Sequence, residues 1–433
     1  MTNDNIKDDI NRGIRDFLST VGHTYAGAFL NKDGKMKKVL EAYKQEMMQW
    51  FTGETAAREN PMKHATQEHW YSLYLEKKRL ESHNCRIQYA EYKHVNRNPL
   101  EAPETVCTFY TDGKYMICRA GQTTGILKNY MRDGAIIGQE NQTYEMDYYI
   151  LSSQNKDGLY ICPGCGAEQS LDTLLDGCDY CKSKFDISAY EDKVMSVMKG
   201  NSILNSRVVY ADAPASAIIL AVFGTIGVFF GLMCALFTLG LSLILAAAGG
   251  VAIYFAFQIE IDANKNKPQA TSIKYRLQDH NPGFSEEEFI GSLDCKLKAI
   301  HYASDPKELA AFVKCNIAPY VKSYRNIVNC ETGRLSYKSY QIKGDYQYLE
   351  LHREIKVMQD CGNHLRPASG VVKVRLAKKV SHKLKNDVVM YRCGGCGATI
   401  SPVEGGKCGY CGNEMDYAAY DWVVIGYKHV NVL

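Results

Sequence analysis

The segments CPGCGAEQSLDTLLDGCDYC (162–181) and CGGCGATISPVEGGKCGYC (393–411) each contain two C-x-x-C pairs. The spacing is C-x2-C-x12-C-x2-C in the first segment and C-x2-C-x11-C-x2-C in the second. Pairs at these spacings form two tight turns that bring four thiolates to the corners of a tetrahedron, the geometry that zinc prefers. We therefore predict two zinc ribbons, one over 160–195 and one over 391–420.

The predicted zinc ligands are the eight cysteines of these pairs: Cys162, Cys165, Cys178, Cys181, Cys393, Cys396, Cys408 and Cys411. Because all four ligands of each site come from the protein, we expect two structural zinc ions rather than catalytic ones. Disulfides or a redox dithiol are the alternative, but redox C-x-x-C motifs do not usually come as matched pairs. The remaining cysteines have no paired spacing, as expected where thiols stay reduced.

The two ribbons lie in longer segments that resemble each other. The segment 160–194, which ends in KFDISAYEDKV, aligns with 391–424, which ends in EMDYAAYDWVV. A match of this length in the two halves of one chain is typical of a tandem duplication. We therefore expect an N-terminal unit over 1–205 and a C-terminal unit over 275–433, each with its own ribbon.

Between the units, the 46 residues from Ala213 to Gln258 include no Asp, Glu, Lys, Arg or His. One helix of this length would reach about 69 Å, more than twice the ~30 Å of a bilayer's hydrocarbon core. Two spans fit better, over 216–237 and 241–257, with Gly249 and Gly250 allowing close helix contact. A buried hairpin of a soluble protein is the alternative, but its helices would normally carry a polar stripe. We predict a transmembrane helical hairpin over 213–258.

A hairpin returns the chain to the side on which it started, so both units and both termini are expected on one side of the membrane. The flanks of the hairpin are basic, with Lys193, Lys199 and Arg207 before it and Lys265, Lys267, Lys274 and Arg276 after it. Basic flanks indicate the cytoplasmic side. The N-terminal MTNDNIKDDI has no signal-peptide pattern, so the hairpin itself would direct the chain to the membrane. We predict a two-span integral membrane protein with both termini in the cytoplasm.

The C-terminal unit has an α+β pattern. A capping box of Ser285 and Glu288 begins one helix, and Asp305 with Pro306 begins a second, short one that runs through Val313. Strand-like runs follow at 335–342, 346–358, 371–380, 388–391 and 422–430. We expect helices on one face of an antiparallel sheet, with the ribbon inserted between the last two strands.

The N-terminal unit is expected to follow the same plan of helices, strands, ribbon and closing segment. Apolar residues recur with a helical period over 10–21, 36–50 and 70–80. Strand-like runs follow at 85–95, 106–119 and 143–161. The predicted fold class is therefore α+β, with two similar units joined by the helical hairpin.

The run NPGFSEEEFIGSLDCKLKAIHYASDPKELAAFV (281–313), with the strands after it, resembles the C-terminal domain family of the mitochondrial inner-membrane translocase's motor-anchoring subunit and its bacterial relatives. The resemblance covers roughly 281–430 and consists mostly of the apolar spacing of Phe284, Phe289, Ile300, Ala303, Leu309 and Phe312. It implies a cone-shaped α+β fold similar to that of the nuclear transport factors, with a hydrophobic pocket. It also implies membrane association and a scaffold or translocation role.

The segment VVKVRLAKKVSHKLK (371–385) is the most basic part of the C-terminal unit. Val372, Val374 and Leu376 alternate with basic residues, so one face of this strand is expected in the core and the other is cationic. Near a bilayer, the cationic face would attract anionic lipid or an acidic partner. The predicted contact residues are Lys373, Arg375, Lys378, Lys379, Lys383 and Lys385. An ordinary solvated strand face is the more common reason for such a pattern.

Two other classes of function deserve comparison. No Ser-His-Asp arrangement, phosphate-binding glycine loop or open metal triad stands out in the sequence. Asp294, His301 and His352 are the candidate pocket residues for acid–base chemistry, although core or surface positions explain them more simply. Ribbons that bind nucleic acid would use stacking aromatics, but the acidic segment of the first ribbon would repel phosphates. The candidate stacking residues are Tyr410, Tyr417, Tyr420 and Trp422.

The sequence therefore predicts a non-enzymatic membrane protein with two zinc-stapled cytoplasmic units. Its expected role is that of a scaffold or tether that binds a protein or an apolar ligand at the membrane face, with a link to protein translocation. A membrane-anchored enzyme and a nucleic-acid binder remain the alternatives. The formal net charge of +3 is too small to indicate a partner.

Overall fold

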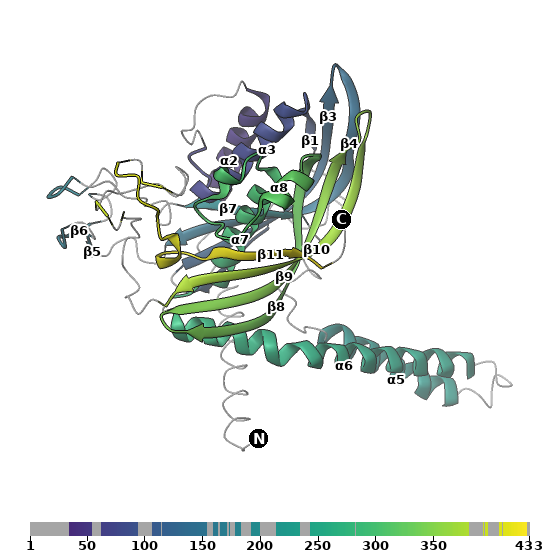
Figure 1. Cartoon of the computed structure of the whole chain (residues 1–433). Coiled ribbons are helices and arrows are strands. Elements are labelled where there is room, and N and C mark those ends of the chain that lie inside the picture. The colour runs from purple at the N-terminus through teal and green to yellow at the C-terminus, as the bar shows by residue number, and fades with distance from the viewer. Residues whose placement is uncertain are drawn as a thin grey trace.

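In the computed structural model, the chain is a mixed α+β protein with antiparallel sheets, which confirms the predicted fold class at this level (Figure 1). The structure describes residues 34–53, 62–93, 106–113, 115–153, 159–162, 165–170, 173, 178–182, 192–199, 214–233, 243–281, 283–380, 393, 395–396, 407–408 and 410–430. The helix predicted over 10–21 and the strand predicted over 388–391 lie outside these residues.

The N-terminal unit packs two helices, α2 (Lys35–Thr52) and α3 (Gln67–Ser82), on a five-stranded antiparallel sheet. The strand order is β1-β3-β4-β7, and β2 pairs with β3 beside β1. The strands are β1 (Arg86–Lys93), β2 (Val106–Asp112), β3 (Tyr115–Arg132), β4 (Ala135–Ser153) and β7 (Lys193–Lys199). A separate two-stranded hairpin, β5 (Leu159–Ile161) with β6 (Glu168–Ser170), belongs to the first ribbon.

The C-terminal unit contains α7 (Glu286–Tyr302), the 3-10 helix η3 (Pro306–Leu309) and α8 (Ala318–Ser323), followed by a four-stranded antiparallel sheet. The strand order is β11-β10-β9-β8. The strands are β8 (Ile327–Lys343), β9 (Tyr346–Asp360), β10 (Leu365–Lys379) and, after the second ribbon and the 3-10 helix η4 (Tyr417–Ala419), β11 (Val423–His429).

The two sheets have the same topology. In each, a long central hairpin is followed by the ribbon, and the last strand then returns to pair with the second strand of that hairpin. β1 pairs with residues 125–131 of β3, and β2 pairs with residues 115–121 of the same strand. Together, β1 and β2 occupy the sheet position that β8 occupies alone in the C-terminal unit. The predicted single strand over 106–119 is divided by Gly113, whose φ of +60° forms the turn between β2 and β3.

A pair of backbone contacts repeats in the same way. The carbonyl of Val194 in β7 accepts from the Thr66 amide at 3.0 Å, and the Val194 amide donates to the His64 carbonyl at 2.8 Å. In the other unit, Val424 of β11 makes the same two bonds with the segment 312–314, at 2.8 and 2.7 Å. In each unit, the segment between the first helix and the next α-helix (α2 and α3, or α7 and α8) is therefore hydrogen-bonded to the last strand of the sheet.

Strand alternation places the cores. Along β9, every second residue from Gln347 to Val357 is buried, and its neighbours are less buried. In α2, the predicted apolar stripe is buried against the first sheet, with Leu40 and Tyr43 fully covered. The helix predicted after Asp305 is shorter than expected, because the capping box of Asp305 and Glu308 begins a 3-10 turn that ends at Leu309.

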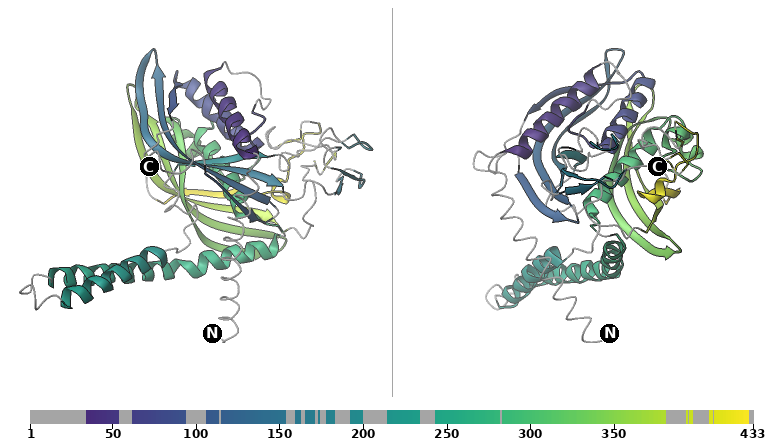
Figure 2. Two further views of the ribbon diagram at one scale, coloured as in Figure 1. Left: turned by 180° about the vertical axis from the view of Figure 1, so that it is seen from behind. Right: turned by 90° about the vertical axis from the view of Figure 1, so that its left-hand side faces the viewer.

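Helix α7 lies in the middle of the body, against α3 of the N-terminal unit (Figures 1 and 2). Its N-terminus meets the carboxylate of Asp112, which accepts from the Glu287 amide at 2.8 Å and from the Ser285 hydroxyl at 3.0 Å. Asp112 belongs to the other unit, at the end of β2. An anionic group here satisfies free helix amides and complements the helix dipole.

The C-terminus of α7 meets Arg79 of α3, whose side chain is only 2% exposed. Its guanidinium donates to the carbonyls of four residues at the ends of α7 and α8: Tyr302, Ala303, Tyr324 and Arg325. These carbonyls have no partner within their helices, and the helix ends carry partial negative charge. One side chain of the N-terminal unit thus caps two helices of the C-terminal unit.

The tips of the two central hairpins also meet. Arg132, at the end of β3, donates to the carboxylate of Asp360 at the end of β9 and to the carbonyl of Gly362. His83 lies 2.7 Å from the same carboxylate. Burial opposes ionisation of Asp360, but the bonds from Arg132, the Gly362 amide and His83 outweigh it and lower its pKa to about 2. The two sheets are therefore joined at this edge by a charged network.

The apolar segment forms two helices, α5 (Pro214–Met233) and α6 (Leu243–His280), which extend away from the body side by side (Figures 1 and 2). α6 does not end near Phe257 as predicted for the second span. It continues without a break into the body, where Ile273 and Leu277 are buried in the core of the C-terminal unit. Counting only the described residues, no helix offers an apolar stretch long enough to cross a membrane.

The two helices touch where both backbones lack a side chain. A Cβ atom added to Gly249 would lie 2.5 Å from the Gly224 carbonyl oxygen, and one added to Gly224 would lie 2.7 Å from that of Gly249. The predicted close contact at Gly249 is confirmed, with Gly224 as its partner. The prediction is wrong for Gly250, because a Cβ atom there would meet nothing within 4 Å.

We predict that Arg79→Met lowers the free energy of unfolding by roughly 3–5 kcal/mol, because several buried carbonyls would lose their donor at about 1–3 kcal/mol each. Urea unfolding of the purified chain measures this. Lys78→Met is the matched control, since Lys78 forms an inter-unit ion pair with Glu308 that is partly exposed and should contribute less than about 1 kcal/mol. Equal stability of the two variants would contradict the role given to Arg79.

We also predict that Gly249→Val destabilises the helix pair by roughly 1–3 kcal/mol through overpacking, whereas Gly250→Val has almost no effect. The two positions are adjacent and differ in what the new side chain would meet. Unfolding of each variant in a detergent series, followed by circular dichroism, provides the comparison. Equal sensitivity of the two variants would show that the helices do not pack through Gly249.

Candidate metal centres

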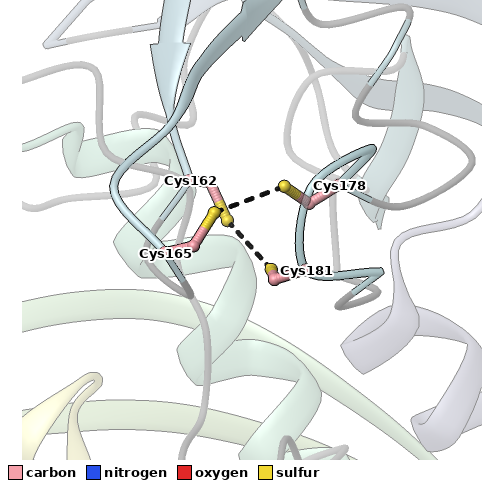
Figure 3. A group of neighbouring side chains, drawn as sticks. All are labelled: Cys162, Cys165, Cys178 and Cys181. Atoms are coloured by element: carbon pink, nitrogen blue, oxygen red, sulfur yellow. Dashed lines mark hydrogen bonds between the residues drawn. The ribbon is translucent and has the colours of Figure 1, made fainter.

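The first cysteine group comes from two turns (Figure 3). Cys162 and Cys165 lie on the turn between β5 and β6, and Cys178 and Cys181 lie on a second turn opposite it. The sulfur of Cys162 is 3.7 Å from that of Cys181, and the sulfur of Cys165 is 3.6 Å from that of Cys178. The four sulfurs lie within 4.8 Å of one another.

The second group repeats this arrangement. The sulfurs of Cys393 and Cys411 are 3.4 Å apart, and those of Cys396 and Cys408 are 3.6 Å apart. In both groups the first and third cysteines are buried and the second and fourth are exposed. The structure thus brings together all eight cysteines predicted as ligands, in two sets of four.

The spacing of the sulfurs fits a tetrahedral metal site. With metal–sulfur bonds of ~2.3 Å, a tetrahedron has sulfur–sulfur edges of about 3.8 Å. The observed separations of 3.4 to 3.7 Å are close to this edge and much longer than the ~2.05 Å of a disulfide bond. All eight thiols are free. Each group can therefore hold a metal ion.

Local backbone geometry explains why these sequences form such sites. The Gly395 amide lies 3.4 Å from the Cys393 sulfur, and amides of Cys396 and Gly395 lower the pKa of Cys393 to about 6. The residue after the last cysteine of each group, Lys182 or Gly412, has a positive φ of +56° or +75°. Its amide donates to the carbonyl of the third cysteine, at 2.7 or 2.9 Å, which closes the turn.

The second ribbon is anchored to the body by apolar packing. Its buried sulfurs belong to one cluster with Met415, Tyr417 and Ala418, which packs on Ala311, Ala377 and Val423 of the C-terminal unit. The first ribbon is braced internally, since the Gln169 side chain in β6 accepts from the Asp179 amide of the second turn at 3.3 Å. Both ribbons leave the body at the same end (Figures 1 and 2).

The predicted basic strand is β10. Its alternation is as expected, with Val372, Val374 and Leu376 fully buried. The opposite face is partly neutralised, because Lys373 forms a 2.8 Å ion pair with Glu350 of β9. Arg375 and Lys379 are exposed and Lys378 is half-buried, whereas Lys383 and Lys385 lie outside the described residues. Contact of this face with lipid or an acidic partner stays a prediction.

The three candidate acid–base residues do not come together. The carboxylate of Asp294 lies 2.7 Å from the guanidinium of Arg353, and both side chains are buried between α7 and β9. His301 is fully buried, stacks on Tyr324 at 4.4 Å and bonds to the Leu297 carbonyl at 2.7 Å. Burial lowers its pKa to about 4. These two residues therefore have ordinary core partners.

The third candidate, His352, lies on the opposite face of β9 from the buried residues. Partial burial lowers its pKa, and the nearby Lys338 and Lys373 lower it further. The stacking aromatics expected at a nucleic-acid surface are also divided: Tyr410 is exposed and Tyr420 half-buried, but Tyr417 and Trp422 are buried in the body. Two of the four candidate stacking residues, Tyr417 and Trp422, are therefore not available at the surface.

One charged group that the sequence did not indicate lies next to the second ribbon. Lys296 of α7 binds the carboxylate of Asp421, before β11, and lies 3.8 Å from that of Glu68 on α3. These residues are far apart in sequence, and no motif connects them. With Tyr71, Phe312 and Trp422, they line a small pocket.

Comparison with known proteins adds no assignment: no family model, curated protein or solved structure matches this chain.

We predict that metal analysis of the purified chain finds two ions per chain. The double substitution of Cys393→Ser with Cys396→Ser should reduce this to one, because two ligands cannot complete a four-sulfur site. Cys361→Ser is the control, since Cys361 is an exposed free thiol outside both groups and its loss should leave two ions bound. A folded chain with well below two ions would contradict the assignment.

Proposed function

We propose that this chain is a two-span integral membrane protein whose two cytoplasmic α+β units, each stapled by a structural zinc ion, form a scaffold or tether that binds a partner polypeptide or apolar ligand at the membrane face. The observation that carries the proposal is the exposed apolar surface of α5 and α6.

The helix pair has an apolar surface that a water-soluble protein would normally bury. Of nineteen large hydrophobic residues that are exposed in the described chain, twelve lie on α5 and α6. They include Phe223, Phe229, Phe255 and Phe257, all more than half exposed. A contiguous apolar patch of this kind marks a surface that meets lipid or protein. The uncharged sequence continues over all 46 residues from Ala213 to Gln258, beyond the part whose side chains are described.

Lipid is the favoured contact because the exposed side chains occur on both helices of a pair that extends away from the body (Figure 1). The described helices alone are too short in apolar sequence to cross a bilayer, but the uncharged run of 46 residues has room for two spans of about 20 residues each. The end of α6 that enters the body contains charged residues, unlike its apolar end. Lys274 pairs with Glu286 at 2.9 Å, and the guanidinium of Arg276 lies 4.9 Å from the centre of the Tyr340 ring. Basic residues at this end favour a cytoplasmic body.

Zinc is the metal that best suits the two groups. Four thiolates in a tetrahedron favour zinc over the oxygen-binding metals, and iron–sulfur clusters are the other common use of such ligands. The ligands would be the two sets of four cysteines already described. A bound divalent ion would offset the charge of the thiolates and cross-link the two turns of each ribbon.

The proposed role as a scaffold derives from the resemblance of 281–430 to the translocase-subunit family and from the arrangement of the surfaces. Both ribbons lie at one end of the body, and the apolar helices leave it elsewhere (Figures 1 and 2). A partner could thus contact the ribbon end while the helix pair holds the chain in the bilayer. Family resemblance is an analogy and carries no catalytic role.

We predict that the full-length chain stays in the membrane pellet after alkaline extraction of cells that express it, because more than 40 uncharged residues would be in the bilayer. A variant in which 213–258 is replaced by a short Gly/Ser linker should move to the soluble fraction with two metal ions still bound. Release of the full-length chain into the aqueous phase without detergent would refute membrane insertion. It would leave the metal assignment untouched.

A further inference from the structure

A pocket of about 40 Å³ lies where the two units and the second ribbon meet. Its wall is formed by α3 of the N-terminal unit, α7 and the segment after η3 of the C-terminal unit, and the chain that leads from the ribbon into β11. Most of its lining is apolar or aromatic, and three charged side chains, Glu68, Lys296 and Asp421, interrupt it. Tertiary contact between distant segments thus creates a site that neither unit could form alone.

The charged groups of this pocket are unevenly paired. Lys296 is buried, and its ammonium binds the Asp421 carboxylate and donates to the Ser292 hydroxyl at 2.8 Å. Burial alone would raise the pKa of Asp421, but the charges of Lys296 and Lys378 lower it. The carboxylate of Glu68 is 3.8 Å from the Lys296 ammonium, beyond hydrogen-bond distance. Among the ion pairs of the described residues, Asp421 therefore has a direct contact with a cation and Glu68 has only this long one.

The pKa shifts of the group agree with this uneven pairing. Partial burial raises the pKa of Glu68, whose side chain is 36% exposed; the attraction of Lys296 opposes this rise and the repulsion of Asp421 adds to it. Burial alone would lower the pKa of Lys296, but Asp421 and Glu68 outweigh it and raise it. Because part of the Glu68 side chain is accessible, a second cation can reach its carboxylate and stabilise the ionised form.

The other residues that line the pocket suit a cation with an apolar chain attached to it. Tyr71, Phe312 and Trp422 contribute aromatic rings, and the faces of aromatic rings attract cations. Tyr417 also lines the pocket, but the ammonium of Lys314 already lies 5.9 Å from its ring centre. In size, the pocket has room for roughly three water-sized groups, since each needs about 10–15 Å³. That is the space of the last atoms of a lysine side chain.

We propose that this pocket binds the side-chain ammonium of a lysine from a partner polypeptide, with Glu68 as its counter-ion and the aromatic rings around its methylene stem. The inference rests on the proposed scaffold function in one respect, the presence of a polypeptide partner, and names the chemistry by which that partner is recognised. It is independent of insertion into the membrane. Because Tyr417 and Val423 also belong to the apolar cluster around Cys393 and Cys408, metal loss from the second ribbon should weaken binding here.

The test uses the purified full-length chain and n-butylammonium, a lysine side-chain analogue, with n-butanol and butyrate as matched neutral and anionic probes. Saturation-transfer NMR titrations measure each dissociation constant. We expect n-butylammonium to bind at least tenfold more tightly than n-butanol, and butyrate to show no saturable binding. Butanol that binds as tightly as butylammonium, or butyrate that binds better, would overturn the proposal.

Two variants assign the effect to the pocket. Glu68→Gln should weaken n-butylammonium at least tenfold while leaving butanol unchanged, whereas Glu81→Gln, on the exposed face of the same helix, should change neither. An unchanged dissociation constant in Glu68→Gln would overturn the proposal. Alkaline extraction is unaffected by these substitutions, so failure of the pocket and failure of membrane insertion would be seen separately.

Discussion

Helix α7 is held at both ends by charges that belong to the other half of the chain. Asp112 accepts from the Glu287 amide in its first turn, and Arg79 donates to the carbonyls of its last turn. Each charge has the sign that the helix dipole favours. Because Arg79 also caps α8, loss of this side chain would remove a donor from the ends of two helices. The two units are therefore parts of one body, although the apolar helix pair separates them in sequence.

The shared topology of the two units is the arrangement that a tandem duplication would produce. Both units use the same strand order, and both insert a cysteine ribbon before the last strand. The units differ where they meet. The N-terminal unit has a 16-residue helix, α3, where the other has the six-residue α8, and α3 supplies Glu68, Tyr71 and Arg79 to the junction. The site at this junction thus depends on features that the two units do not share.

The sequence predicts features that depend on neighbours along the chain. Cysteine spacing indicated both metal groups, and alternation indicated the faces of β10, because these patterns are local. The Ser285 cap of α7 was predicted and is confirmed, because it too is local. The contacts of Asp112 and Arg79 with the ends of α7, and the cluster of Glu68, Lys296 and Asp421, could not be predicted, because they join residues more than a hundred positions apart. Gly224 was missed and Gly250 wrongly included for a similar reason: the helix face that meets its partner is set by the packing, which glycine content alone does not reveal.

The continuity of α6 has a mechanical consequence. The helix extends from its apolar end to His280, and the amides of Asn281 and Gln347 then bond to each other in both directions at 2.7 and 2.8 Å, fixing its end to the sheet. A stiff rod clamped at its base transmits tilt and rotation, whereas a loose linker would absorb them. If the apolar end of α6 is embedded in lipid, the tilt of this helix sets the distance and the orientation of both cysteine ribbons relative to the bilayer. Any change in that tilt would move both ribbons together.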